Sequence, residues 1–277
     1  PEDQELFGDG LFSTSYDTCY FGRAVQFAGK YFYFVQDHES EFFATGSYHF
    51  LASETYKFGF NCITAGKWLA EKVTAVGGSI AGYFELAVDR KLFFENSKKE
   101  NSGVTRIAAY ARSGTPRRLT ELTILSLNIL YRKGLSFEVD FFGDRNLPLD
   151  AIFPHRVLGV LEPHELGELY RSCDIGCVFS ATNYSLVPLE MMACGLPVVE
   201  FDGENTRKTY PRNAVSFAKP TPEAIAQSVH ELIVDIDLQK KQITAGRDYI
   251  NSLSWEKSAR KIETALMNVL KEKDIKL

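Results

Sequence analysis

The sequence contains no apolar stretch long enough to span a bilayer, and its first residues lack the charged and apolar regions of a signal peptide. We therefore expect a cytoplasmic protein. Its five cysteines are odd in number, scattered and mostly embedded in apolar runs, which is typical of buried, reduced thiols. Cys173 and Cys177 have no second pair of ligands elsewhere, so we expect no metal site.

Common cofactor and hydrolase motifs are also missing. Residues Gly8–Gly10 begin like a dinucleotide fingerprint, but Ser13 stands where the closing glycine belongs and no strand precedes them. The chain has neither a Walker lysine nor a Gly-x-Ser-x-Gly elbow. Its net charge of -5 gives no general attraction for nucleic acid. We expect no nicotinamide or flavin cofactor and no nucleic-acid partner, and any anion site must be local.

What the sequence does contain is a regular alternation of β-rich runs and segments of helical period, typical of an α/β protein with parallel sheets. The first part predicts strands at 11–16, 31–35, 61–64 and 79–84 and helices at 17–28, 46–58 and 67–73. Residues 1–10 contain no predicted strand. We therefore expect a first domain that is truncated at its amino end.

A second domain follows a polar linker between 85 and 103, which predicts domains at 1–94 and 95–277. It predicts strands at 105–110, 136–142, 156–160, 175–179, 197–201 and 214–217, and helices at 117–132, 165–172, 186–193, 222–235, 238–250 and 255–271. This pattern indicates a complete doubly wound domain.

Residues 174–201 are the most informative stretch: an apolar strand, a polar turn, a short helix and another apolar strand. Ser185 can cap the helix, and Gly195 ends it. Free amides at such a helix start, at the carboxyl edge of a parallel sheet, form a phosphate site. Glu190 lies one turn further and could accept sugar hydroxyls. The alternative is an ordinary loop followed by an exposed glutamate.

Residues 185–199, SLVPLEMMACGLPVV, resemble the signature of the large retaining glycosyltransferase family that has the GT-B fold of two Rossmann-like domains. The resemblance implies that Glu190 holds the nucleotide ribose and that the turn at Ser185 and Leu186 contacts the diphosphate. The family usually has a second glutamate near the transferred sugar, where this sequence has Thr182. The identity of the sugar is therefore left open.

Residues 107–118, IAAYARSGTPRR, resemble the strand and loop that open the second domain of this family. The resemblance implies that Arg112 and Arg117 bind the donor diphosphate, with Arg118 a further candidate. A guanidinium suits this task because it pairs two oxygens at once and keeps its charge. The alternative is a solvated basic loop.

Three further segments fit the same fold. Residues 141–145, FFGDR, end a strand where the family brings its backbone close to the base or phosphate, which implies a contact at Gly143 and suggests Arg145. Residues 87–94 resemble the connection between the domains. The helix that starts at Trp255 resembles the one that returns to the first domain.

Residues 30–47, KYFYFVQDHESEFFATGS, resemble more narrowly the bacterial rhamnosyltransferases of surface-polysaccharide assembly. In them a strand delivers a Gln-Asp pair and an acidic residue to the cleft between the domains. The resemblance implies that Asp37 and Glu39 face the acceptor or the donor sugar, which makes the first domain the acceptor side. His38 is a lesser candidate, because a lone histidine is more often structural.

Together these matches imply transfer of a hexose or deoxyhexose, with retention, from a nucleoside diphosphate sugar to a hydroxyl of a glycan or lipid-linked glycan. The expected setting is O-antigen or other surface-polysaccharide synthesis in a bacterium, with peripheral association at the inner face of the plasma membrane. The resemblance favours deoxythymidine diphosphate rhamnose, with uridine and guanosine donors as alternatives. No cofactor or metal is expected, and the oligomeric state stays open.

Two other functions are compatible with these residues. A nucleotide-sugar epimerase or sugar-phosphate synthase on the same fold would keep the phosphate clamp and differ in the cleft. A non-catalytic partner subunit that binds a nucleotide sugar is suggested by Thr182 and by the short first domain.

Overall fold

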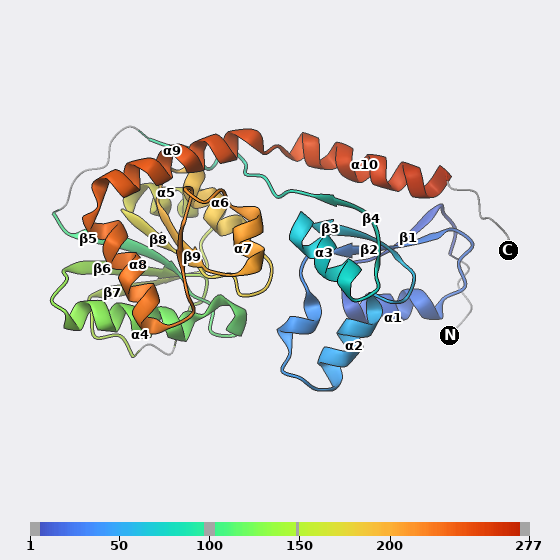
Figure 1. Cartoon of the computed structure of the whole chain (residues 1–277), viewed down its shortest axis with the longest axis horizontal. Coiled ribbons are helices and arrows are strands. Elements are labelled where there is room, and N and C mark those ends of the chain that lie inside the picture. The colour runs from blue at the N-terminus through green and yellow to red at the C-terminus, as the bar shows by residue number, and fades with distance from the viewer. Residues whose placement is uncertain (1–5, 97–102, 148–149, 272–277) are drawn as a thin grey trace. The chain divides into compact units, whose positions relative to one another are not determined.

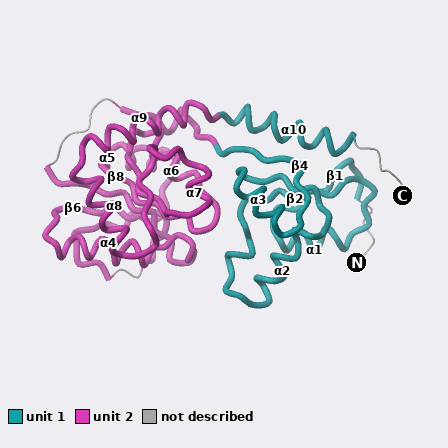
Figure 2. The backbone as a smooth tube through the Cα atoms, in the orientation of Figure 1, with its two compact units in different colours: residues 1–86, 254–277 teal, residues 87–253 magenta. Residues whose placement is uncertain are grey.

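The computed structural model describes residues 6–96, 103–147 and 150–271 (Figure 1). The chain divides into two compact units (Figure 2). Unit 1 spans 1–86 and 254–277, and unit 2 spans 87–253. All five cysteines are buried and free.

Unit 1 is a parallel sheet whose described strands follow the order β1-β2-β3-β4. Its elements are β1 (Gly10–Ser13), α1 (Tyr16–Ala24), β2 (Lys30–Val35), the 3-10 helix η1 (Glu39–Phe42), α2 (Ser47–Thr55), β3 (Asn61–Ala65), α3 (Lys67–Ala75), β4 (Ser79–Phe84) and α10 (Trp255–Lys271). Alternate residues of β2 face opposite sides of the sheet. Tyr33 packs in a core with Trp68 of α3, and Phe32 packs in another with Ala265 of α10.

The described residues of unit 2 form a six-stranded parallel sheet with the order β10-β9-β8-β5-β6-β7. Its elements are β5 (Thr105–Tyr110), the 3-10 helix η2 (Pro116–Arg118), α4 (Thr120–Arg132), β6 (Phe137–Phe142), β7 (His155–Gly159), α5 (Pro163–Ser172), β8 (Ile175–Cys177), α6 (Leu186–Ala193), β9 (Val198–Phe201), α7 (Glu204–Thr209), β10 (Ser216–Ala218), α8 (Pro222–Val234) and α9 (Ile236–Ser252). Helices α4 and α8 cover one face and share an apolar core with it. The other face is covered by α5 and α6, and α9 packs on α6.

The strand order of unit 2 reverses at its centre. From β5 the chain adds β6 and β7 on one side, and then returns to add β8, β9 and β10 on the other side. Because β5 and β8 are neighbours, the loops that follow them leave the carboxyl edge of the sheet in opposite directions. Such a switch point is where open α/β sheets bind ligands.

The boundary between the units differs from the sequence expectation. The first break falls after residue 86 rather than after 94, because residues 87–95 pack on unit 2. The rings of Phe93 and Tyr170 lie 6.0 Å apart, and Glu95 pairs with Arg247 of α9 at 2.6 Å. The second break precedes α10, which packs on β4 within unit 1. The polar residues 97–102 of the expected linker lie outside the described residues.

Local structure departs from expectation in the loop after β5. A helix was expected from 117, but α4 begins at Thr120. Pro116 starts the short helix η2, and Leu119 then adopts a left-handed conformation (φ 50°), which separates η2 from α4. Arg117 and Arg118 therefore lie on a tight turn at the sheet edge. The short helices η1 and α7 were not expected at all, because one turn carries too little periodicity to recognise.

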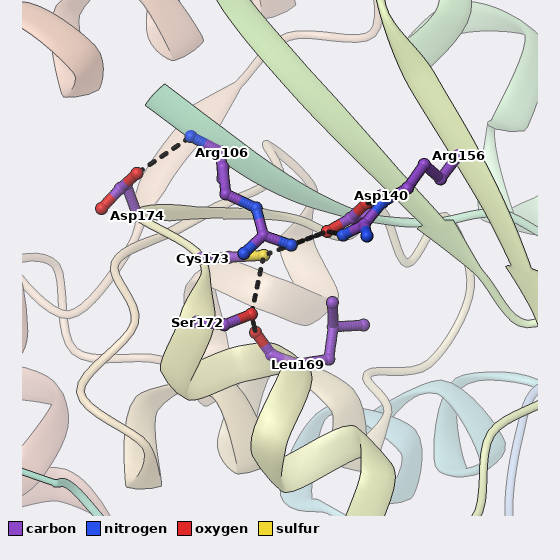
Figure 3. Close-up of polar contacts among 7 residues, drawn as sticks. All are labelled: Arg106, Asp140, Arg156, Leu169, Ser172, Cys173 and Asp174. Carbon is purple, nitrogen blue, oxygen red and sulfur yellow. Dashed lines mark hydrogen bonds and ion pairs between the residues drawn. The ribbon is translucent and has the colours of Figure 1, made fainter. Parts of the chain in front are cut away.

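An ion-pair cluster around the buried Asp140 lies on the α5 side of the sheet (Figure 3). Asp140 of β6 accepts hydrogen bonds from Arg106 at 2.6 Å and from Arg156 at 2.7 Å. Burial favours the neutral acid, but these guanidinium groups outweigh it and lower the pKa of Asp140. The Cys173 thiol, at the end of α5, lies 3.9 Å from the same carboxylate (Figure 3). The cluster joins β5, β6, β7 and α5 and is a structural element.

Candidate functional site

The two segments singled out in the sequence of the second domain lie side by side at the switch point. The Ala181 amide, in the turn after β8, donates to the Arg117 carbonyl at 3.1 Å. The Arg118 guanidinium donates to the Ser180 hydroxyl at 3.2 Å and lies over the Tyr110 ring. These contacts fix the basic loop after β5 against the turn that leads into α6.

A pocket of about 400 Å³ opens at the ends of β5, β6 and β7. It is lined by Arg112, Gly114, Thr115, Gly143, Asp144, Arg145 and Val160. The Arg112 side chain is exposed, while its amide is anchored by the Thr120 hydroxyl at 3.0 Å. Ser113 donates to Asp144 at 2.5 Å, and this bond lowers the pKa of that carboxyl. Two cationic side chains, those of Arg112 and Arg145, therefore line an open pocket.

Gly143 lines this pocket, and its backbone conformation and close neighbours require a glycine. Its φ is 108°, and a Cβ there would lie 2.6 Å from the Tyr110 ring and 2.9 Å from the Ala111 carbonyl. Its amide donates to the Gly159 carbonyl at 2.8 Å. The glycine thus lets the loops after β5, β6 and β7 approach one another, which shapes the wall of the pocket.

Helix α6 begins where the sequence predicts, with Ser185 at the N-cap and Leu186 as its first residue. The expected side-chain cap does not form, and the buried Ser185 hydroxyl makes no hydrogen bond to the described residues. The amides of the first helical turn have no partners within the helix. The start of α6 therefore offers backbone donors at the switch point.

Glu190 is half-buried and lies one turn into α6. Burial raises its pKa to about 7, and the Tyr170 hydroxyl, which donates to Glu190 at 3.4 Å, partly offsets this. Tyr170 also packs edge-to-face on Phe142, the residue before Gly143. Glu190 is not among the residues that line the pocket around Arg112. Its connection to that pocket runs through Tyr170 and Phe142.

Glu200, the third residue of β9, was not expected from the sequence. Its carboxylate is fully buried and accepts bonds from the Ser180 amide at 2.8 Å and the Ser180 hydroxyl at 3.1 Å. Asn205 of α7 donates to the Ser180 carbonyl at 2.7 Å. The sequence feature that could have indicated Glu200 is a single charged residue in an otherwise apolar strand, VVEF. Thr182, where a glutamate was expected from the resemblance, is buried.

Similarity to a known protein family covers most of unit 2. Residues 105–230 match the family model described as WsaF, C-terminal domain. The chain is also 31% identical, over 283 residues, to the O-antigen biosynthesis protein RfbC of Myxococcus xanthus. That match covers 97% of this chain and 22% of the relative, so the chain spans about a fifth of that protein's length.

Solved structures match both units. HepE of Anabaena, in complex with UDP and glucose, has a TM-score of 0.78 at 14% identity, over 94% of this chain and 78% of HepE. Sucrose-phosphate synthase of Thermosynechococcus elongatus has a TM-score of 0.76 at 13% identity, over 94% of this chain and 73% of that enzyme. The chain has the GT-B fold. The expectation of two Rossmann-like α/β domains is confirmed.

In this GT-B protein the expected acidic residues of the first domain lie at the end of β2. Asp37 is half-buried, and its carboxylate accepts the amide of His38 at 2.8 Å. The buried His38 ring stacks on Tyr56, and its Nδ1 lies 3.1 Å from the Ser40 hydroxyl. These contacts hold the 37–40 turn and η1 together.

Glu39 differs from the expectation that it faces a substrate. The side chain is buried, and its two oxygens accept bonds from the Tyr16 amide and the Tyr33 hydroxyl, both at 2.8 Å. Tyr16 is the first residue of α1, so the carboxylate lies at the positive end of that helix. Burial raises the pKa of Glu39. Its contacts give Glu39 a structural role, because both oxygens are occupied inside unit 1.

Among the described residues, no cluster of three or more His, Cys, Asp and Glu side chains has a geometry that could hold a metal ion. Across the same residues, no helix combines the length and apolar character needed to cross a membrane.

Proposed function

We propose that this chain is a glycosyltransferase that binds a nucleoside diphosphate sugar in unit 2 and transfers the sugar to a hydroxyl of a growing surface polysaccharide. The observation that carries the proposal is the junction at the switch point. There the Arg117–Arg118 turn is bonded to the segment that precedes α6, beside a pocket lined by Arg112 and Gly143. The similarity to the O-antigen protein RfbC supports the polysaccharide setting.

The chemistry of such a site follows from its charges. Cleavage of the bond between the anomeric carbon and the diphosphate leaves negative charge on the departing oxygen. Arg112, Arg117 and the amides at the start of α6 stabilise that charge, because oriented donors and guanidinium groups act on developing anions without reorganisation. The half-buried Glu190 accepts hydrogen bonds from the ribose hydroxyls, which favour its ionised form.

Two finer features complete the proposal. Transfer proceeds with retention, as the resemblance of residues 185–199 implies. The donor is deoxythymidine diphosphate rhamnose, in keeping with the resemblance of residues 30–47 to rhamnosyltransferases. A uridine donor is the first alternative, because the structurally similar HepE was solved with UDP and with UDP-glucose. The acceptor is a glycan or lipid-linked glycan, with the protein associated peripherally with the membrane.

A donor panel tests this proposal directly. Titration calorimetry with deoxythymidine, uridine and guanosine diphosphates should give a dissociation constant in the micromolar range for one of them. That ligand should also raise the melting temperature, since it binds only the folded state. The corresponding nucleotide sugar should be hydrolysed slowly. Absence of binding for all three nucleotides contradicts the proposal.

A second candidate is a non-catalytic subunit that binds a nucleotide sugar. It is favoured by the buried Thr182 in place of a glutamate and by the internal bonds of Glu39, which leave fewer acidic groups for catalysis. Tight donor binding without hydrolysis or transfer would identify it. A GT-B epimerase or synthase would instead release an altered free sugar or a sugar phosphate, which product analysis detects.

A further inference from the structure

Behind the turn that precedes α6 lies a polar network that the proposed chemistry does not use. Its centre is Glu200, whose side chain is fully buried. Oε1 accepts the Ser180 and Phe201 amides, both at 2.8 Å, and Oε2 accepts the Ser180 hydroxyl at 3.1 Å. A carboxyl group placed in an apolar strand is costly to bury, so three such bonds mark a strongly determined position.

The network continues from Glu200 to the basic loop. The hydroxyl of Ser180 bonds Glu200 on one side and accepts from Arg118 Nη1 at 3.2 Å on the other. The Arg118 guanidinium also lies over the Tyr110 ring, with 5.6 Å between its carbon and the ring centre. Arg118 is therefore held from two sides, and Ser180 is the link between it and Glu200.

We propose that Glu200 is a positioning residue for the donor diphosphate: through Ser180 it holds the Arg118 guanidinium and the turn that precedes α6 in the geometry that binds phosphate oxygens. This inference rests on the function proposed above. Glu200 itself is buried behind Ser180 and does not touch the ligand. Its effect should therefore be confined to the diphosphate and should depend on Arg118.

The charged and titratable surroundings of Glu200 are compatible with this role. Arg118 faces it from η2, and Tyr210 approaches it from the end of α7. The buried Tyr210 hydroxyl makes no hydrogen bond to the described residues, and its ring packs against Tyr184 and Tyr249. Burial raises the pKa of Glu200 to about 8, and Arg118 opposes that rise.

The test compares diphosphates with nucleosides. In the full chain at pH 9, where Glu200 is mostly ionised, Glu200→Gln keeps the shape of the side chain but turns a donor toward Ser180, which displaces Arg118. We expect the affinity for UDP and deoxythymidine diphosphate, used as probes, to fall about tenfold, and the affinity for uridine and thymidine to change less than twofold. Tyr210→Phe is the matched control, since it removes a neighbouring buried hydroxyl, and it should leave both affinities unchanged.

Dependence on Arg118 separates positioning from a general loss of structure. In an Arg118→Ala background, Glu200→Gln should weaken diphosphate binding less than twofold further, because the group that Glu200 positions is gone. Ser180→Ala, which cuts the link while leaving Glu200 in place, should reproduce the tenfold loss and also serves if Glu200→Gln fails to fold. An equal loss for nucleosides and diphosphates, or a full tenfold loss without Arg118, overturns the inference.

The two proposals fail in different ways. If the unaltered chain binds none of the nucleoside diphosphates, the proposed function fails, and this inference falls with it. If the unaltered chain binds UDP or deoxythymidine diphosphate and the Glu200→Gln and Ser180→Ala variants bind it equally well, only the positioning role is overturned.

Discussion

The carboxyl edges of the two sheets carry similar kinds of residue and use them differently. In unit 1 the described strands follow chain order. Glu39, which follows β2, is bonded to Tyr16 and Tyr33 within the unit. In unit 2 the strand order reverses at β5 and β8, and Arg112 is left exposed at a pocket. Polar residues at a sheet edge therefore indicate a ligand site only where the topology separates the loops.

The same contrast separates the two glutamates that the sequence singled out. Glu39 has both oxygens occupied by donors of its own unit, one of them a helix amide. Glu190 has one long bond, 3.4 Å from Tyr170, and a pKa raised to about 7. A carboxylate with one long internal bond keeps its capacity for a ligand, whereas one with a short bond to each oxygen stabilises the fold.

The largest effect should come from Glu39, whose two oxygens each accept a hydrogen bond within unit 1. Glu39→Ala leaves the Tyr33 hydroxyl and the Tyr16 amide without their acceptor in a buried site, which should lower the free energy of unfolding by about 3 kcal/mol. Urea unfolding of the full chain measures this. Asp37→Ala, at a half-buried neighbour, is the control and should cost less than about 1 kcal/mol. If Glu39→Ala keeps full stability but loses turnover, Glu39 does not have a structural role, and the contrast between the two units is wrong.

The second effect concerns donor binding by Glu190. Glu190→Gln should weaken the affinity for a nucleoside diphosphate by about 2 kcal/mol, roughly thirtyfold, because a charged acceptor of two hydroxyls becomes a neutral one. Calorimetry measures the change. Glu168→Gln, an exposed position on α5, should have no effect. If Glu190→Gln binds the nucleoside diphosphate with unchanged affinity, Glu190 has a structural role like that of Glu39.

Arg112 should contribute somewhat less, because its side chain is solvated. Arg112→Ala should weaken diphosphate binding by about 1.5 kcal/mol, and the loss should shrink as ionic strength rises and screens the exposed charge. Titrations at low and high salt measure both. Arg132→Ala, exposed at the end of α4, is the matched control for net charge. Equal losses in the two variants would show that only overall charge matters.

The smallest effect is the pH dependence of donor binding. Because Glu190 has a pKa of about 7 and its ionised form accepts the ribose hydroxyls, affinity should rise with pH. From pH 6 to pH 8 the ionised fraction grows about tenfold, and affinity should grow by up to that factor. A nucleotide sugar is the suitable probe, since its diphosphate does not titrate there. Glu190→Gln should flatten the profile, and an unchanged slope in that variant would assign the dependence to another group.

The raised pKa of Glu190 also affects the stability of the fold. Rising pH should lower this stability, whereas it should raise the affinity for the donor. Glu190 and Glu200 have raised pKa values of about 7 and about 8 in the folded chain. The folded state therefore binds more protons than the unfolded state, so the stability these groups contribute is fully present below about pH 4.5 and is lost as pH rises through 7 to 8. The melting temperature of Glu200→Gln should accordingly fall less between pH 6 and pH 9 than that of the unaltered chain.

The sequence by itself determined the regular elements and the two segments of unit 2 that meet. The expected strands at 79–84 and 105–110 and helices at 186–193 and 255–271 have the bounds seen in the structure, because period and punctuation are local properties. The phosphate-site expectation at Ser185 also came from a local pattern, whereas that at Arg117 came from a family resemblance. The hydrogen bond between the Ala181 amide and the Arg117 carbonyl, which joins the two segments, followed from the order of parallel strands, which sequence motifs only imply.

Only the tertiary structure decided which polar groups are free for a ligand. Nothing local distinguishes Glu39 from Glu190, yet the donors that occupy Glu39 come from Tyr16 and Tyr33, and the former lies 23 residues away. Glu200 was overlooked for the same reason, since its partner Ser180 lies 20 residues earlier on a neighbouring strand's turn. A hydrogen bond is satisfied by whatever the fold brings within about 3 Å, and chain topology sets that distance.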